Sequence, residues 1–193
     1  GGIHNLFFLP ALIISLLVFY LLFLFLSIIY CRIVTSLLKR NIGIFPNSST
    51  VQLLRVTADV LTSHLATPLY PSMPFLIPFM GAKVGKNLIF TGKIFNADLF
   101  EAGNNVLIGE DAFLSGHIQH KNKFILGKII IGNDVTIGVR SFIMPDVEIG
   151  DRSIIAAYAV VTMGTRIPPD EIWGGVPARK IGESNMQAAN RGT

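Results

Sequence analysis

The chain has 193 residues, of which 51% are hydrophobic and 15% charged, and its formal net charge is +4. The basic residues are scattered and not interleaved with aromatic residues, a pattern that argues against nucleic acid as a partner. Cys31 is the only cysteine, which excludes an internal disulfide and a thiolate metal cluster, and we expect no metal cofactor.

The first predicted element is a membrane-spanning helix. Residues 6–30 carry no charge and are mostly Leu, Ile and Phe. At about 1.5 Å per residue, such a helix can cross the ~30 Å hydrocarbon core of a bilayer. Arg32, Lys39 and Arg40 follow the apolar run, a bias that predicts a cytoplasmic location for the following domain. We expect residues 1–46 to form a retained anchor; a buried hairpin of soluble helices is the alternative.

Residues 47–83 form the second predicted unit. The apolar positions between residues 51 and 65 approximate the stripe of an amphipathic helix. Four prolines follow between Pro68 and Pro78, and they exclude a regular helix or a central strand there. This stretch is expected either to lie in the membrane interface or to cap the first coil of the next domain. The sequence does not separate the two arrangements.

From residue 84 the chain has a period of six. The phase passes through Val84, Phe90, Asn96, Ala102, Ile108 and Leu114, and later through Ile131, Ile137, Ile143, Ile149, Ile155, Val161, Ile167 and Trp173. Neither strand alternation nor a helix has this period, and a fixed short repeat predicts a solenoid. Three repeats make a triangular coil of about 18 residues. The predicted fold is therefore an all-β left-handed parallel β-helix over residues 84–182, with a tail at 183–193.

The period breaks between Leu114 and Ile131, which are 17 residues apart. We interpret this gap as two steps of six and an insertion of about five residues near 120–124. Insertions in a solenoid leave the coil on one face, where sites are often built. His117 and His120 lie at this break.

Counting along the predicted coils places three residues around His117. Leu99 is expected beneath it with Asp98 alongside, and Arg140 is expected above it. A carboxylate at Asp98 can orient the imidazole, as carboxylates do in nucleophile-activating triads. A cation at Arg140 favours the neutral imidazole, which is the form that acts as a general base.

These motifs resemble known families. The I-G-x-x-x-x repeats and the ending WGGVPARK at 173–180 resemble the hexapeptide-repeat acyltransferases, many of which end in W-x-G-x-P-A-[RK]. A closer resemblance, to the membrane-bound C-terminal region of poly-lysine-synthetase-type nonribosomal peptide synthetases, includes DLFEAG at 98–103 and LSGHIQHKNKF at 114–124. That family tends to show H-x-x-E, where this chain has His120 at the fourth position.

The resemblance implies a membrane-anchored acyl- or aminoacyltransferase that forms a homotrimer with sites between neighbouring β-helices. It implies a coenzyme A thioester or a phosphopantetheinyl carrier protein as donor, and a hydroxyl or amine as acceptor. His117 is then the expected general base, and His120, Asp98 and Arg140 are candidates for orientation or charge. The candidate donor-binding residues are Arg166, Arg179, Lys180 and Trp173.

Two other functions stay open. A structural or assembly module without catalysis fits the missing carboxylate of H-x-x-E. A γ-carbonic-anhydrase-like site needs three histidines around one metal, and the spacing of His117 and His120 does not match that family. The chain begins without methionine, which fits a fragment of a larger synthetase and equally a processed start.

Overall fold

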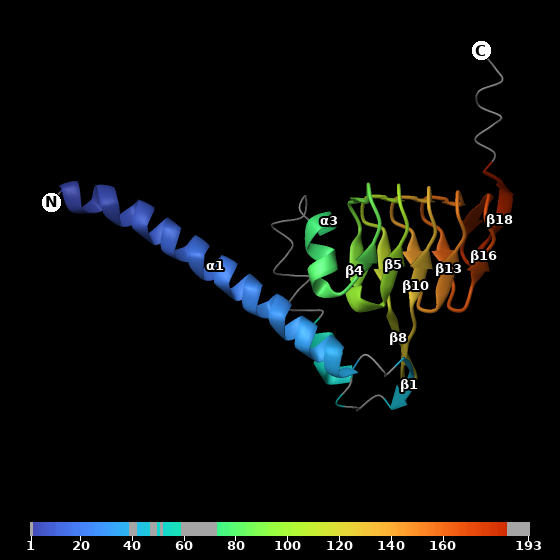
Figure 1. The fold of residues 1–193 in the computed structure, drawn as a ribbon, viewed down its shortest axis with the longest axis horizontal. Coiled ribbons are helices and arrows are strands. Elements are labelled where there is room, and N and C mark those ends of the chain that lie inside the picture. The colour runs from blue at the N-terminus through green and yellow to red at the C-terminus, as the bar shows by residue number, and fades with distance from the viewer. Residues whose placement is uncertain (1, 39–41, 47–49, 51, 59–72, 185–193) are drawn as a thin grey trace, which may run out of the picture.

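The computed structural model describes residues 2–38, 42–46, 50, 52–58 and 73–184. The N-terminal helix α1 (Gly2–Leu38) extends away from a β-helix, and only its C-terminal turns approach that domain (Figure 1). Among the described residues, α1 is the one helix long and apolar enough to cross a membrane, over Phe8–Leu37. Most of its apolar side chains face outward, because only 11% of the most hydrophobic stretch of this helix is buried.

Over residues 83–183 the β-helix has three faces, each built from short parallel strands of successive coils. We name each face by one of its strands. The β5 face contains β2 (Lys83–Val84), β5 (Phe100–Ala102), β10 (Ile129–Ile131), β13 (Val147–Ile149) and β16 (Arg166–Ile167). The β6 face contains β3 (Ile89–Phe90), β6 (Leu107–Ile108), β11 (Thr136–Ile137), β14 (Ile154–Ile155) and β17 (Glu171–Gly175), with β18 (Ala178–Glu183) added antiparallel. The β7 face contains β4 (Lys93–Phe95), β7 (Phe113–Ser115), β12 (Phe142–Ile143) and β15 (Val160–Val161).

The core of the β-helix follows the six-residue period. Ile108, Ile137 and Ile155 stack on the β6 face and are each 0% exposed. Each coil can bury this apolar residue only against its neighbours, so the coils stabilise one another. The corners need left-handed backbone, which Asn and Asp adopt more readily than most residues; Asn105 and Asp134 do so at φ 56° and 57°. The parallel β-helix expected from the repeat, preceded by a long apolar helix, is confirmed.

The proline-rich segment covers the first coil. It forms α3 (Met73–Leu76) and η2 (Ile77–Met80), and Ile77 and Met80 are buried in the same core cluster as Leu24 of α1. The packing of residues 77–80 is the one expected of a cap, and residues 68–72 of this stretch lie outside the described residues. The stripe expected over residues 51–65 is helical at 52–58, and its remainder lies outside the described residues, as do residues 185–193 of the tail.

The break in the period is an antiparallel hairpin. Strands β8 (His117–His120) and β9 (Lys123–Leu126) pair with each other, and β1 (Gly43–Pro46) adds to β9 (Figure 1). Leu114 on the β7 face pairs with Ile143, and Ala102 on the β5 face pairs with Ile131. The chain therefore passes from Leu114 to Ile131 in one step of the coil.

The expected two steps with about five extra residues are thus wrong, because the insertion is the whole hairpin. A gap of 17 residues fits one step of the coil with a long insertion as well as two steps with a short one. Ile118 in the hairpin also lies where the six-residue period would place an apolar residue. The first coil departs from the period as well. Ile94, 6% exposed, takes the inward place that the period assigns to Asn96, and it pairs with Leu114.

Candidate active site

The hairpin leaves the coil at Gly116, immediately before His117. A Cβ at Gly116 would lie 2.9 Å from the Asn96 Cβ and 3.2 Å from the Leu99 Cβ. A side chain at this position would therefore push the hairpin away from the first coil, and glycine permits the close approach. The backbone N–H of Gly116 donates to the carbonyl of Phe95 at 3.1 Å, so His117 is held directly beside that coil.

Within the described part of the chain, the imidazole of His117 contacts the amide of Asn96 and two aromatic rings. Its Nδ1 lies 2.5 Å from Oδ1 of Asn96. Its ring centroid lies 5.0 Å from that of Phe124 and 6.1 Å from that of Phe95. An amide oxygen is an acceptor, so this orientation of Asn96 requires the proton on Nδ1. The other nitrogen, Nε2, then carries the lone pair that a general base needs.

Asn96 is one of two site residues that the sequence did not predict; the other is Arg55. It is 3% exposed and has left-handed backbone, with φ 59° and ψ 60°, a conformation that Asn tolerates well. Because Ile94 fills the inward position, the Asn96 side chain is available to His117. The signal was present in the sequence, since Asn96 is a polar residue where the period calls for an apolar one.

The charge that acts on His117 comes from Arg55, in the helical residues 52–58. Burial lowers the pKa of His117 below its ordinary value, and the positive charge of Arg55 lowers this pKa further. Arg55 is 1% exposed, and its Nη1 donates to both carboxylate oxygens of Asp98, at 2.9 and 3.1 Å. Both effects favour the neutral imidazole. The cation that acts on His117 is thus Arg55 and not the expected Arg140.

Arg140 does not stack on His117, so this part of the prediction is wrong. The one-step connection shifts the register, and Arg140 follows Asp111 on the same corner, with Nε 3.6 Å from Oδ2 of Asp111. Its Nη1 donates to the Tyr158 hydroxyl at 3.4 Å, as the 18-residue coil predicts for that pair. Asp98 lies near the site but binds Arg55, and Asn96 takes the contact with the imidazole that was expected of Asp98.

His120 lies at the far end of β8 and is exposed. Residues three apart on a strand point to opposite faces, so the two histidines of the hairpin do not converge. No group of three His, Cys, Asp or Glu side chains suited to a metal ion occurs in the part of the chain that the structure describes.

The candidate donor-binding residues divide between two places. Trp173 Nε1 donates to Glu171 Oε2 at 2.7 Å, and Lys180 Nζ lies 2.8 Å from Glu171 Oε1, so these two side chains share one carboxylate. Arg179 is exposed on the same β17–β18 hairpin. Arg166 is on the β5 face instead, paired with Asp146 and Glu148 at 2.8 and 3.3 Å.

Known proteins share this repeat. Residues 128–162 match the family described as bacterial transferase hexapeptide (six repeats). The putative acetyltransferase YvoF of Bacillus subtilis (strain 168) is 30% identical over 139 residues, which cover 68% of this chain and 80% of that protein. Galactoside O-acetyltransferase of Escherichia coli (strain K12) is 43% identical over 90 residues, or 43% of each chain. Delta-poly-L-ornithine synthetase of Acinetobacter baumannii (strain AB307-0294) is 25% identical over 109 residues, 56% of this chain but 8% of that protein.

Solved structures agree with this assignment. A galactoside acetyltransferase in complex with coenzyme A has a TM-score of 0.55 and 26% identity, covering 76% of this chain and 88% of that chain. A hexapeptide-repeat acetyltransferase of Vibrio cholerae O1 biovar eltor, complexed with acetyl coenzyme A, has a TM-score of 0.50 and 27% identity, covering 54% and 61%. This chain belongs to the hexapeptide-repeat acyltransferase superfamily, and its class of activity is acyl transfer.

Proposed function

We propose that this protein is a membrane-anchored acyltransferase that moves an acyl group from a coenzyme A thioester to a hydroxyl or amine acceptor. The observation that carries the proposal is the contact of the half-buried His117 imidazole with Asn96, at the point where the hairpin leaves the coil; burial and Arg55 lower the pKa of this imidazole and so favour its neutral form. Residues 1–46 serve as the anchor, 47–83 as the connection and 84–182 as the catalytic β-helix. The basic residues after the apolar run, Arg32, Lys39 and Arg40, favour a cytoplasmic site.

His117 acts as the general base. Its Nε2 removes the proton from the acceptor O–H or N–H while that atom attacks the thioester carbonyl carbon. The C–S bond then breaks, and the proton passes from the imidazolium to the departing thiolate. Asn96 accepts the hydrogen bond from Nδ1–H throughout and so keeps Nε2 directed at the acceptor. The lowered pKa keeps the imidazole neutral near pH 7, ready to accept a proton.

Coenzyme A is the donor favoured here, because two similar solved acetyltransferases hold coenzyme A or its acetyl thioester. Trp173, Lys180 and Arg179 lie together at the C-terminal end and are the first candidates for its polar groups. A thioester on a carrier protein is the second candidate donor, supported by the likeness to the poly-ornithine synthetase.

Thiol release tests this proposal. The full chain in detergent or lipid is supplied with acetyl coenzyme A, or with an aminoacyl-loaded carrier protein, and a panel of amines and alcohols. Replacing His117→Ala should lower turnover by about 10²- to 10⁴-fold, the usual contribution of a general base. Gln119→Ala, at an exposed position of the same strand, is the matched control and should retain wild-type turnover. Undiminished turnover in a folded His117→Ala variant, checked by its circular dichroism melt, would show that His117 is not the base.

A further inference from the structure

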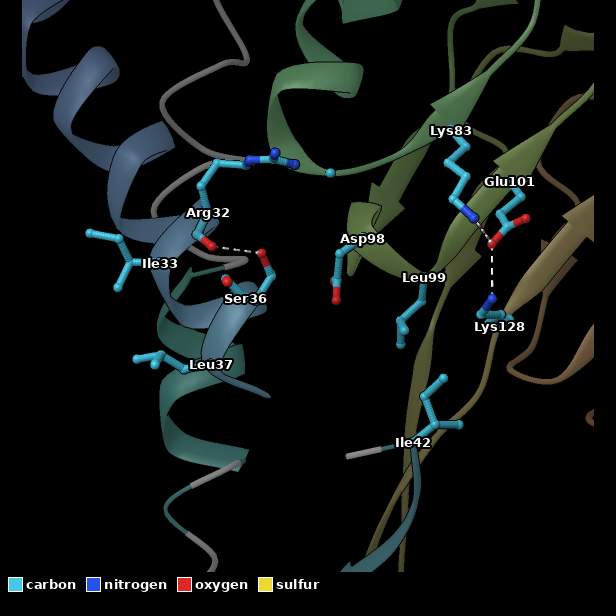
Figure 2. Close-up of a pocket in the computed structure, with 12 residues that line it drawn as sticks. Arg32, Ile33, Ser36, Leu37, Ile42, Lys83, Asp98, Leu99, Glu101 and Lys128 are labelled. Atoms are coloured by element: carbon cyan, nitrogen blue, oxygen red, sulfur yellow. Dashed lines mark hydrogen bonds and ion pairs between the residues drawn. The ribbon is translucent and has the colours of Figure 1, made fainter. Parts of the chain in front are cut away.

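A cleft of about 680 Å³ lies between the last turns of α1 and the β5 face. Figure 2 shows Arg32 and Ser36 of α1 on one side of it, and Lys83, Glu101 and Lys128 of the β-helix on the other. Leu99 of the first coil also lines the cleft and lies beside Gly116, where the His117 hairpin begins, so the cleft and the hairpin share a wall. The proposed acyl transfer does not use this space.

The β-helix side of the cleft carries excess positive charge. Nζ of Lys83 and Nζ of Lys128 lie 3.0 and 2.9 Å from the same oxygen of Glu101. Hydrogen bonds from Lys128 and Lys83 lower the pKa of Glu101, so this carboxylate is ionised. One carboxylate between two ammonium groups leaves a positive charge uncompensated. The other carboxylate on the lining, Asp98, is already bound to Arg55.

The α1 side adds a second positive charge. The guanidinium of Arg32 reaches across the cleft, with Nη1 3.6 Å from the place a Cβ would take on Gly81. None of the carboxylates in the described ranges forms an ion pair with Arg32. Arg32 is also the first charged side chain after the apolar run. A hydrocarbon core of ~30 Å takes about 20 residues of helix, which places Arg32 near the level of the lipid head groups when α1 spans the bilayer.

We infer that this cleft binds the anionic head group of a membrane phospholipid. The inference rests on the proposed membrane anchoring. Arg32 and the Lys83–Glu101–Lys128 group supply the charge complementary to a phosphate. Ile33 and Leu37, which also line the cleft and are 54% and 76% exposed, supply apolar surface for the adjoining acyl chains. A cleft that has cations on both sides and exposed apolar residues of α1 at its edge suits an amphiphile better than a free anion.

Native mass spectrometry of the full chain tests the inference. Detergent-solubilised protein is titrated with phosphatidylglycerol and, separately, with phosphatidylcholine, and bound lipid is counted. We expect phosphatidylglycerol to bind in preference. Arg32→Gln and Lys128→Gln should each weaken its binding about fivefold, the effect of one cation at a membrane surface. Lys86→Gln, an exposed lysine of the first coil outside the cleft, should leave binding unchanged.

Three results would overturn the inference: equal retention of the two lipids, equal weakening by Lys86→Gln and Arg32→Gln, or complete displacement of phosphatidylglycerol by millimolar inorganic phosphate. The last result would identify a free-anion site in place of a lipid site. Alkaline carbonate extraction keeps the two proposals separate. Release of the chain from membranes contradicts the anchoring, whereas a chain that stays in the membrane and shows no lipid preference contradicts the head-group site alone.

Discussion

At the scale of single residues, the hydrogen bond between His117 and Asn96 orients the ring of the proposed base and places its proton on Nδ1. Burial and the charge of Arg55 lower the pKa of His117, so the midpoint of the acid limb of kcat/KM should lie below the ordinary histidine pKa of about 6.5. Asn96→Asp places a carboxylate at Nδ1, which stabilises the imidazolium and raises its pKa. We expect the acid limb of a kcat/KM profile to move to higher pH in this variant.

Asn96→Gly is the control for this experiment. Glycine accepts the left-handed backbone of residue 96 without strain but offers the imidazole no acceptor. Turnover should fall on the order of tenfold to a hundredfold through lost orientation, and the acid limb should not move to higher pH. Coincident pH profiles for Asn96→Asp and Asn96→Gly would mean that residue 96 does not govern the ring.

At the scale of elements, the β8–β9 hairpin has its own small core, separate from that of the coils. Phe124 is 1% exposed, packs with Leu99, Leu126 and Phe45, and makes a tilted ring contact with His117. Phe124→Ala should destabilise the hairpin by about 3–5 kcal/mol and reduce turnover, because the imidazole loses its support. Hydrogen exchange should accelerate in residues 117–126 and stay slow in the coils.

Lys123, an exposed residue next to Phe124 on β9, provides the control for this experiment. Lys123→Ala should leave exchange in the hairpin unchanged. If hydrogen exchange in the Phe124→Ala variant accelerates equally in the hairpin and in the coils, the hairpin is not an independent element. That result would mean that the hairpin and the β-helix unfold as one unit.

At the scale of the whole molecule, one row of aromatic rings marks the surface expected to meet a second protomer. Phe95, Phe113 and Phe142 follow one another along the β7 face in edge-to-face and tilted contacts, with ring centroids 5.1 and 5.3 Å apart. Each is partly exposed, and Phe95 borders His117. In the expected trimer, with sites between neighbouring β-helices, this apolar surface beside the proposed base would be buried against a second protomer. We predict that Phe142→Asp lowers the molar mass in detergent from three chains to one and reduces turnover.

Ile130→Asp serves as the matched variant, since Ile130 is 36% exposed on the β5 face and should leave the assembly intact. The measurement is analytical ultracentrifugation of the wild type and both variants in one detergent. A wild-type mass of a single chain would make the expected trimer wrong.

The sequence by itself determined the elements whose signal is local. The β-helix follows from a period of six because each inward residue repeats the same choice, coil after coil. The apolar helix α1 follows from a long run without charge. His117 was identifiable because it lies where that period breaks.

Only the tertiary structure decided what surrounds His117. Asn96 and Arg55 lie far from His117 in the sequence, and no local pattern specifies which distant side chain reaches the imidazole. Arg140 was misplaced because a gap of 17 residues is compatible with one step of the coil or with two. The number of steps is decided by the pairing of β5 with β10 and of β7 with β12, the strands before and after the hairpin. Register depends on these hydrogen bonds between coils and not on spacing along the chain.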